Sequence, residues 1–364
     1  MGYERGDLHR DGGPASASGR HGTAGGAHSR GPDGAGGHGA APSDGRKKKK
    51  RLKRWQKVAI GAGVPVAILL VAAIALFSYL GSLDKNMALD DLAMKDLKGV
   101  LAQQPASPTD PYYVLVLGSD AREGETASRS DTIMLCRLDP GNKRVSILSI
   151  PRDTKVELEG YGTQKINAAM AYEGPAGAVK AVSGFVGVEI AHVALIDFAG
   201  FSGIVDALGG VTVDVPLYTE FDGIELQPGV QTLNGTQALA FARCRMEYGL
   251  GDFQRAANQR ILLKAVASQV MQASPTEIPS LVGSLTTSVG TDLKVTDLVG
   301  LVGSFRGMSA DADIYTGQVP STTDMIDGVS YVITIEDQWA GVREKFVGGE
   351  VPFVDSSNQP AVID

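Results

Sequence analysis

The residues best suited to chemistry in this chain are Arg and Asp side chains that recur in short motifs beside predicted strands. Five of them are Asp120, Arg129, Asp131, Arg152 and Asp153. A single Arg or Asp is usually a loop charge or part of a surface ion pair, and five gathered at one place weaken that interpretation. Guanidinium groups bind phosphate in a bidentate manner, and carboxylates bind divalent cations. The pattern therefore predicts a site for a polyanion, held by arginines and by a metal ion bridged to carboxylates.

Three predicted strands would position these five side chains, at 112–118, 131–138 and 144–150. The motifs follow the first strand, begin the second and follow the third. If the strands pair as consecutive antiparallel neighbours, these three places share one edge of the sheet. Arg129 and Asp131 also point to the same side of an extended chain, because side chains alternate along a strand. The sequence thus predicts one charged cluster at a sheet edge.

A second polar set follows a predicted helix over 235–242, whose start, Asn234-Gly-Thr-Gln237, resembles a capping box. Arg243 and Arg245 come at its end. In a continuing helix they would lie about 200° apart, whereas in an extended chain they share a face. We expect the helix to end here so that both arginines aim at one ligand. Two solvent-facing arginines are the alternative interpretation.

A long helix is predicted over 252–273, with Asp252 as its N-cap candidate. Arg255 and Gln259 lie three and seven residues further on, which places them on the same helix face as Asp252. The rest of the helix is apolar, so a polar stripe on its first two turns is better explained by function than by solvent exposure. Lys165, just before another predicted helix, could add a further cation.

Strands and helices alternate along the rest of the chain without internal repeats. Further strands are expected at 192–198, 211–215 and 313–319, and further helices at 166–172, 176–187, 199–208, 277–288 and 295–306. Such alternation is typical of a layered α/β domain in which helices cover a sheet. The predicted fold class is therefore α/β.

The charges divide the chain into three parts. Residues 1–57 hold 13 Lys and Arg against 5 Asp and Glu, residues 58–80 hold no charge, and residues 81–364 have a net charge of −15. The uncharged span is long enough to cross a bilayer, and the basic run before it places the N-terminus in the cytoplasm by the positive-inside rule. A cleaved signal peptide is the alternative, but its apolar region is usually about 7–15 residues long. We favour an uncleaved signal-anchor in the cell membrane, with the large domain outside.

The expected organisation has five parts. They are a disordered basic cytoplasmic tail (1–57), a transmembrane signal-anchor (58–80), an extracellular stalk and linker (81–111), a catalytic domain (112–350) and a C-terminal tail (351–364). Few large apolar side chains occur in the first part, so it cannot offset its ordering entropy by burial. In the stalk, residues 84–104 are predicted to be helical.

Composition also excludes several function classes. His192 is the one His beyond the basic tail, which argues against a His-dependent hydrolase or a His-rich zinc site. The acidic domain argues against nucleic-acid binding. Beyond residue 80 there is no Walker loop, G-x-G-x-x-G, G-x-S-x-G or H-E-x-x-H motif, so we do not expect a nucleotide in a standard loop. Cys136 and Cys244 are too few for a disulfide scaffold, and their spacing fits one disulfide or two separate buried thiols.

Seven sequence motifs follow one another along the chain. They are Leu117-Gly-Ser-Asp-Ala-Arg, Arg129-Ser-Asp-Thr-Ile-Met-Leu, Ser149-Ile-Pro-Arg-Asp-Thr, Lys165-Ile-Asn-Ala-Ala, Val205-Asp-Ala-Leu-Gly-Gly-Val, Ala238-Leu-Ala-Phe-Ala-Arg-Cys-Arg and Asp252-Phe-Gln-Arg. With them the chain resembles the LytR–CpsA–Psr family, strongly over 112–275 and loosely over 276–350. Seven ordered motifs are far more specific than any single one.

The resemblance implies a three-layer α/β/α domain with a central mixed or antiparallel sheet and a lipid pocket. It also implies an enzyme that transfers a glycopolymer, such as teichoic acid or capsule, from a polyprenyl-pyrophosphate carrier to peptidoglycan. The acceptor hydroxyl would displace the lipid phosphate and leave a phosphodiester bond to the wall, with Mg²⁺ or Mn²⁺ as cofactor. The alternatives are a polyprenyl-pyrophosphate hydrolase, with water as acceptor, and a non-enzymatic regulator of envelope assembly.

The family roles carry over to matching positions. Asp120 and Asp131 would coordinate the metal ion. Contacts with the pyrophosphate would come from Arg129, Arg152, Lys165, Arg243, Arg245, Arg255 and Gln259. The catalytic set would be Arg152, Arg243, Arg245 and Asp252, of which the last would orient an arginine or activate the acceptor.

One departure from the family pattern lies in the second turn of the long helix. Members often have Arg-Gln-Gln there, whereas this chain has Asn258-Gln259-Arg260. The first arginine of this pattern is missing, and so is the phosphate contact that it would make. Arg260 is a poor replacement, because two residues correspond to about 200° around a helix.

Overall fold

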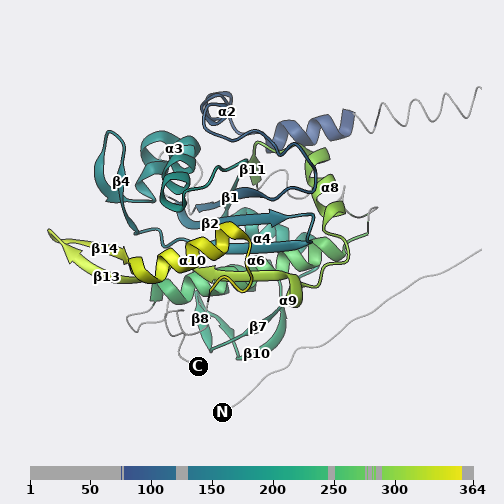
Figure 1. The fold of residues 1–364 in the computed structure, drawn as a ribbon. Coiled ribbons are helices and arrows are strands. Elements are labelled where there is room, and N and C mark those ends of the chain that lie inside the picture. The colour runs from purple at the N-terminus through teal and green to yellow at the C-terminus, as the bar shows by residue number, and fades with distance from the viewer. Residues whose placement is uncertain are drawn as a thin grey trace, which may run out of the picture. The chain divides into compact units, whose positions relative to one another are not determined.

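The computed structural model describes residues 78–119, 130–244, 251–274 and 289–354, together with positions 75, 277, 281 and 283. A six-stranded mixed sheet lies at the centre of the domain (Figure 1). In spatial order its strands are β11 (Val289–Thr291), β6 (His192–Asp197), β1 (Tyr112–Ser119), β2 (Ser130–Asp139), β3 (Arg144–Ser149) and β12 (Ile314–Gln318). β1, β2 and β3 pair as antiparallel neighbours, which confirms the predicted arrangement. β6 and β12 join this trio in parallel on either side.

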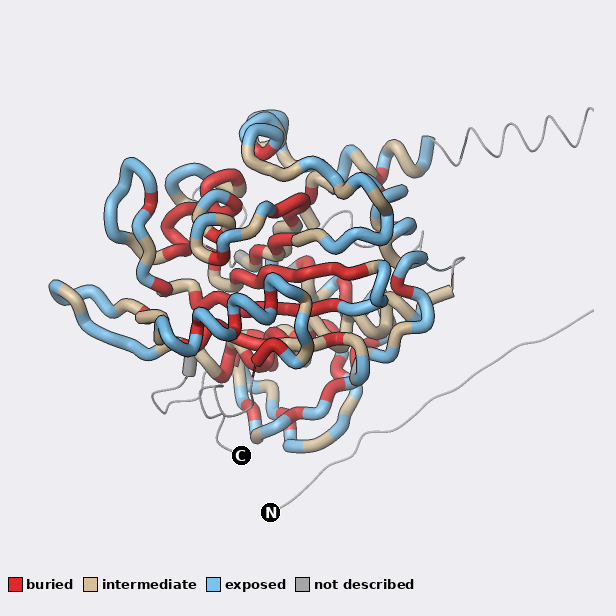
Figure 2. Tube along the Cα trace, in the orientation of Figure 1, coloured by how far each residue is buried: buried red, intermediate tan, exposed pale blue. Residues whose placement is uncertain are grey.

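Helices cover both faces of the sheet, because alternate side chains of each strand point to opposite faces. One face packs against α3 (Ala168–Val186) and α10 (Glu336–Gly348), and the other against α6 (Gly251–Gln272) and α8 (Val295–Ser304). The strand residues of the first face include Leu115, Leu117, Ile133, Leu135 and Leu148, and those of the second include Val114, Met134, Cys136, Val145 and Ile147. The central strands are accordingly buried over most of their length (Figure 2). The α/β class and the helix-covered sheet are confirmed.

α3 contains a break, and its two halves correspond to the helices predicted at 166–172 and 176–187. Glu173 and Gly174 have non-helical backbone angles, and the φ of Gly174 is +61°. Glycine adopts this left-handed region without a steric penalty. Pro175 follows and disfavours a helical conformation at the residue before it. The break lets the two halves of α3 take different directions.

A smaller apolar cluster lies beside α6. It is built from α4 (Phe198–Ala207), α5 (Gly235–Arg243), β7 (Val211–Val215), β9 (Ile224–Leu226) and β10 (Gly229–Leu233), and β9 pairs with β8 (Thr219–Phe221). The predicted capping box begins α5: Asn234 Oδ1 accepts from the Gln237 amide at 2.9 Å, and Gln237 Oε1 accepts from the Asn234 amide at 3.1 Å. The predicted start of this helix is thus confirmed.

Short polar elements were not predicted from the sequence. They include the hairpin of β4 (Lys155–Leu158) and β5 (Gly162–Lys165), the hairpin of β13 (Ser321–Ile326) and β14 (Val329–Thr334), and the short helix α9 (Ala310–Asp313). Their strands are only four to six residues long and few of their residues are buried, so hydrophobic periodicity marks them weakly. An isolated bridge between Thr154 and Val332 joins the two hairpins.

The expected stalk is packed onto the domain instead of standing free. A helix over 78–87 is followed by α2 (Asp91–Lys98), and both Met87 and Leu97 are buried. Met87 packs with α8, and Leu97 belongs to the main core beside α3. The single helix predicted over 84–104 is wrong, because the chain forms two helices here and the Asp90 side chain caps the second by accepting from the Leu92 and Ala93 amides.

The expected C-terminal tail over 351–364 also begins inside the core. Phe353 is 1% exposed, and its ring lies edge-on to Phe346 of α10 with centroids 5.1 Å apart. Gly317 of β12 leaves the space for it, since a Cβ there would lie 2.7 Å from the Phe353 ring. The chain is thus folded up to this point, and residues 355–364 lie outside the described part.

The predicted membrane anchor over 58–80 lies outside the described residues except for positions 75 and 78–80. The predicted tail over 1–57 lies wholly outside them, as does most of the helix predicted at 277–288. Within the part of the chain that the structure describes, no helix combines the length and apolar character needed to cross a membrane.

Candidate active site

A row of four charged side chains lies at the edge of the sheet where β2 begins and β3 ends. An Arg152 guanidinium nitrogen donates to Asp131 Oδ1, and Arg152 Nε lies 3.8 Å from Asp153 Oδ2. Lys165 Nζ lies 3.2 Å from Asp153 Oδ1. All four side chains are between 22% and 25% exposed. The structure therefore brings together Asp131, Arg152 and Asp153 as predicted, and adds Lys165 to them.

Backbone hydrogen bonds fix the turn that carries Arg152 and Asp153. Thr154 is fully buried, and both its amide and its hydroxyl donate to the Pro151 carbonyl, at 3.0 and 2.6 Å. The Arg152 carbonyl accepts from the Asn167 amide at 3.1 Å. The β4–β5 hairpin that follows pairs its first residue with Lys165, its last. This pairing is why Lys165 returns to Asp153.

The first turns of α6 form the opposite wall. Gln259 Oε1 accepts from the Thr132 hydroxyl at 2.9 Å, and Gln259 Nε2 donates to the Ala242 carbonyl at 3.3 Å. Arg255 and Gln259 are 7% and 8% exposed, so the polar stripe is buried as predicted. The helix begins at Gly251, so the predicted N-cap Asp252 lies in its first turn.

Arg260 lies about 200° around the helix from Asn258. It is 5% exposed and donates to Gln318 Oε1 at 2.9 Å, and burial lowers its pKa to about 10. Asn258, at the position of the missing arginine, donates to the Phe241 carbonyl at 3.0 Å and accepts from Gln254 at 2.9 Å. Neither residue replaces the missing arginine, because Arg260 is buried against Gln318 and Asn258 joins α6 to α5.

α5 ends at Arg243, and Cys244 has extended backbone angles, φ −56° and ψ 131°. The predicted end of the helix is therefore confirmed. Three predicted site residues lie outside the described part of the chain: Asp120, Arg129 and Arg245. Asp252 lies in α6, and its side chain is likewise not among those described.

Two cavities meet at the Thr132–Gln259 hydrogen bond, since both residues line both of them. The first, of about 190 Å³, has the charged and polar side chains Asp131, Arg152, Asp153, Arg255 and Gln318 in its lining, and we call it the polar cavity. The second, of about 90 Å³, is apolar. Its lining includes Val116, Met134, Ile196, Phe201, Ile204, Leu262, Leu263 and Val266. The site therefore suits a ligand with an anionic group joined to a hydrocarbon chain.

Comparison with known proteins agrees with this geometry. The LytR_cpsA_psr family model matches residues 78–346, which is most of the chain. The chain belongs to the LytR–CpsA–Psr family. The resemblance inferred from seven motifs is thereby confirmed.

Relatives of this LytR–CpsA–Psr protein carry names that state an activity. A protein of Halalkalibacterium halodurans named polyisoprenyl-teichoic acid–peptidoglycan teichoic acid transferase TagU is 33% identical over 297 residues, covering 79% of this chain and 96% of that protein. The crystal structure of Bacillus subtilis TagV superposes with a TM-score of 0.60 at 30% identity, covering 68% of this chain and all of that one. A structure of TagT bound to LI-WTA has a TM-score of 0.58 at 25% identity and covers 69% of this chain and 96% of that one.

Two site residues of this family member were missed from the sequence. Thr132 was visible as the neighbour of Asp131, and only the fold shows that its hydroxyl reaches α6. Gln318 ends β12, which runs parallel to β3 and pairs Gln318 with Ser149. A strand parallel to β3 brings its carboxyl end to the same sheet edge as Arg152. The predicted strand at 313–319 would therefore have placed Gln318 at the site if its pairing with β3 had been known.

The two cysteines of this family member are separate buried thiols. Burial raises the pKa of the Cys136 thiol to about 12, and burial is also the main cause that raises the pKa of Cys244. The Cys244 sulfur donates to the Glu220 carbonyl at 3.5 Å. Of the two arrangements left open by the spacing, the structure has two independent thiols and no disulfide between them.

Proposed function

We propose that the chain is a membrane-anchored phosphotransferase. It transfers a glycopolymer from a polyprenyl-pyrophosphate carrier to a hydroxyl of peptidoglycan. The observation that carries the proposal is the junction at Thr132 and Gln259, where a polar cavity with arginines adjoins an apolar one. A lipid pyrophosphate has the same two parts, one anionic and one hydrocarbon. Relatives named as teichoic acid transferases support the same reaction.

In the proposed reaction the acceptor hydroxyl oxygen attacks the phosphorus that carries the glycopolymer. A new P–O bond forms, the P–O bond to the lipid phosphate breaks, and polyprenyl phosphate leaves with the electron pair. The hydroxyl proton passes to a carboxylate, for which Asp252 is the candidate. Phosphoryl transfer depends mainly on positioning and on neutralising charge, which arginines at fixed positions supply.

The proposed pyrophosphate ligands are the cations that the family resemblance assigns to the site. They are Arg129, Arg152, Lys165, Arg243, Arg245 and Arg255, with Gln259 as a neutral donor. Lys165 and Arg152 are already oriented by Asp153. Arg255 is buried beside Gln259, so it would meet the ligand with little competition from water.

A divalent cation, Mg²⁺ or Mn²⁺, belongs to the proposal. Among the described residues no group of three or more His, Cys, Asp or Glu is placed to hold a metal. Asp131 lines the polar cavity, and carboxylate oxygen is the donor that these hard cations prefer. Asp131 and Asp120 would hold the ion, which would neutralise charge on the pyrophosphate when bound.

The proposal is tested with purified full-length chain, a lipid-linked glycopolymer and an acceptor glycan. Arg152→Ala and Asp131→Ala should each lower the initial rate of polymer transfer at least about 100-fold, because each removes charge from the phosphate site. Arg144→Ala is the matched control, since that exposed arginine lies at the opposite end of β3 and should transfer at the wild-type rate. Undiminished transfer by both site variants would refute the assignment.

The same assay separates the alternatives. A hydrolase would release soluble polymer and phosphate without linkage to the acceptor. A non-enzymatic regulator would transfer nothing, and in cells the Arg152→Ala variant would leave the amount of wall-bound polymer unchanged. Formation of a phosphodiester-linked product by the wild type, lost in the site variants, supports the transferase.

A further inference from the structure

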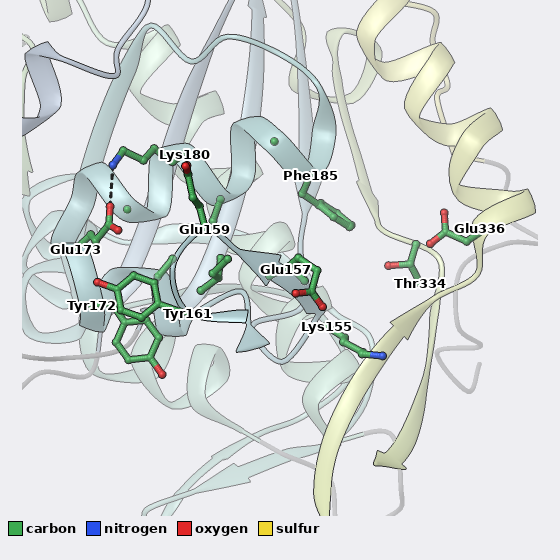
Figure 3. A pocket seen from close by; sticks show the side chains of 16 residues that line it. Lys155, Glu157, Glu159, Tyr161, Tyr172, Glu173, Lys180, Phe185, Thr334 and Glu336 are labelled. Atoms are coloured by element: carbon green, nitrogen blue, oxygen red, sulfur yellow. Dashed lines mark hydrogen bonds and ion pairs between the residues drawn. The ribbon is translucent and has the colours of Figure 1, made fainter. Parts of the chain in front are cut away.

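A third, larger cavity of about 680 Å³ lies on the outer side of α3 (Figure 3). Residues of the β4–β5 hairpin, of α3 and of the segment from Thr334 to Glu336 line it. It shares none of the lining residues given above for the polar cavity of the active site. We call it the hairpin cavity.

The hairpin cavity and the active site are neighbours along two chain segments. Asp153 lines the active site, and Lys155, two residues on, lines the hairpin cavity. In β14, Val332 lines the active site, and Thr334, two residues on, lines the hairpin cavity. The Val332 amide donates to the Asp153 carbonyl at 2.9 Å. From Lys165 at the active site, β5 runs about 10 Å to the far end of the hairpin, at about 3.3 Å per residue. The two cavities are therefore separated by only two residues along each of these segments.

Two stacked tyrosines stand at the far end of the hairpin cavity. The rings of Tyr161 and Tyr172 have centroids 4.4 Å apart with planes at 14°, and both residues are more than 40% exposed. Gln164 fixes the pair: its side chain donates to the Tyr161 carbonyl at 3.2 Å and accepts from the Tyr172 hydroxyl at 3.3 Å. Figure 3 shows the two rings lying parallel. An exposed aromatic stack at a cavity suits the C–H face of a pyranose ring, which is apolar while its rim is polar.

Local backbone geometry places each tyrosine. Tyr161 lies between Gly160 and Gly162, whose φ values of +79° and +68° form the tip of the hairpin. Tyr172 precedes the break of α3 at Gly174, so it stands where the helix changes direction. Each tyrosine is therefore placed by neighbouring glycines whose positive φ other residues rarely adopt.

The charges of the hairpin cavity select among sugar chains. Four carboxylates line it against two lysines: Glu157, Glu159, Glu173 and Glu336 against Lys155 and Lys180. Lys180 is paired with Glu173 at 2.8 Å. Carboxylates accept hydrogen bonds from sugar hydroxyls, whereas a net negative lining repels a polymer of phosphodiesters. The lining therefore favours an uncharged glycan over an anionic one.

We propose that the hairpin cavity binds an uncharged stretch of the acceptor glycan and directs one of its hydroxyls toward the active site. The proposal deepens the phosphotransferase assignment. It rests on that assignment only in identifying the bound glycan as the acceptor. Stacking on Tyr161 and Tyr172 provides affinity, and the carboxylates around them provide the polar contacts.

Binding is measured by calorimetry on the full-length chain in detergent, with the tetramer of N-acetylglucosamine as the probe and no donor present. Tyr161→Ala and Tyr172→Ala should each weaken binding about tenfold, the loss of roughly one aromatic contact. Tyr161→Phe keeps the ring and should bind as the wild type does. Tyr218→Ala, a similarly exposed tyrosine beside β8, is the matched control and should change nothing. In the transfer assay the two alanine variants should raise the KM for the acceptor with little change in kcat.

Several results would overturn the proposal. They are equal binding by the alanine variants, absence of binding to the wild type at about 10 mM probe, or tighter binding of a glycerol phosphate polymer than of the tetramer. The donor-free measurement separates this proposal from the previous one. If the wild type binds the tetramer through the tyrosines and yet transfers no polymer, the phosphotransferase assignment fails and the glycan site stands.

Discussion

At the scale of single residues, the cations of the active site are held by carboxylates before any phosphate is present. Arg152 contacts Asp131 and Asp153, and Lys165 contacts Asp153. Ion pairs that are about a quarter exposed are weak, so a pyrophosphate can compete for the same cations. In the proposed reaction this exchange would release Asp131 from Arg152 and leave its carboxylate for the divalent cation.

A different ion pair stabilises the other end of β2. Arg137 and Asp139 are both less than 10% exposed, and an Arg137 guanidinium nitrogen donates to Asp139 Oδ2 at 2.9 Å. The Asn142 amide donates to Asp139 Oδ1 at 3.1 Å. Burial alone would raise the pKa of the Asp139 carboxyl, but hydrogen bonds from Arg137 and Asn142 and the Arg137 charge outweigh it and lower the pKa below its usual value.

This lowered pKa predicts how stability depends on pH. A carboxyl whose folded-state pKa is depressed stabilises the fold above its unfolded pKa of about 4, and that contribution disappears as pH falls through the folded pKa. We expect Asp139→Asn to lower the melting temperature at neutral pH and to make its decline below about pH 4 shallower than in the wild type. Asp214→Asn, an exposed carboxylate of β7, is the control. Parallel melting curves for Asp139→Asn and the wild type across acid pH would contradict the prediction.

At the scale of elements, the active site depends on how the second turn of α6 meets the end of α5. Asn258 and Gln259 donate to the carbonyls of Phe241 and Ala242. Carbonyls in the last turn of a helix have no partner within the helix, so α6 satisfies them. The position of Arg243, the last residue of α5, is thereby fixed relative to Gln259.

The start of α5 allows a direct test of its capping box. Asn234→Ala removes the acceptor for the Gln237 amide and should lower the free energy of unfolding by about 1 kcal/mol. Thr236→Ala, an exposed position in the same turn, should change it by less than about 0.5 kcal/mol. Urea denaturation of the detergent-solubilised chain, followed by circular dichroism, measures both. A loss for Thr236→Ala as large as that for Asn234→Ala would show that the cap is not the cause.

At the scale of the whole molecule, the segment next to the proposed membrane anchor is fastened to the domain. Asp84, in the helix over 78–87, accepts from the Val295 amide at the start of α8 at 2.7 Å. Ala88 forms a bridge with Thr291 of β11. The chain between the proposed membrane span and the domain is therefore packed against the domain.

This packing sharpens a test of the proposed topology. Proteinase K added to cells stripped of their wall should cut first between residues 102 and 111, the loop that follows α2 and leads into β1. The basic tail over 1–57, inside the cytoplasm, should survive as a membrane-bound fragment. Cells permeabilised with detergent are the control, in which the tail is digested too. Digestion of the tail in intact cells, with the domain protected, would reverse the topology.

The sequence by itself determined the features that depend on nearby residues. The strands β1 to β3, the capping box of α5, the break in α3 and the buried polar stripe of α6 all follow from local periodicity, turn chemistry or helix geometry. The charged cluster at the sheet edge was also predictable, because antiparallel pairing of three short-linked strands leaves few alternatives. Helix geometry likewise placed Arg260 about 200° around α6 from Asn258, the position of the missing arginine.

Only the tertiary structure decided the features that join distant parts of the chain. The docking of Met87 and Leu97, the burial of Phe353, the Thr132–Gln259 hydrogen bond and the stack of Tyr161 on Tyr172 belong to this class. Each depends on which surface a side chain meets after folding. The local sequence around an apolar side chain such as Met87 does not specify that partner. The junction of the polar and apolar cavities is of the same kind, because it forms only where α6 crosses the edge of β2.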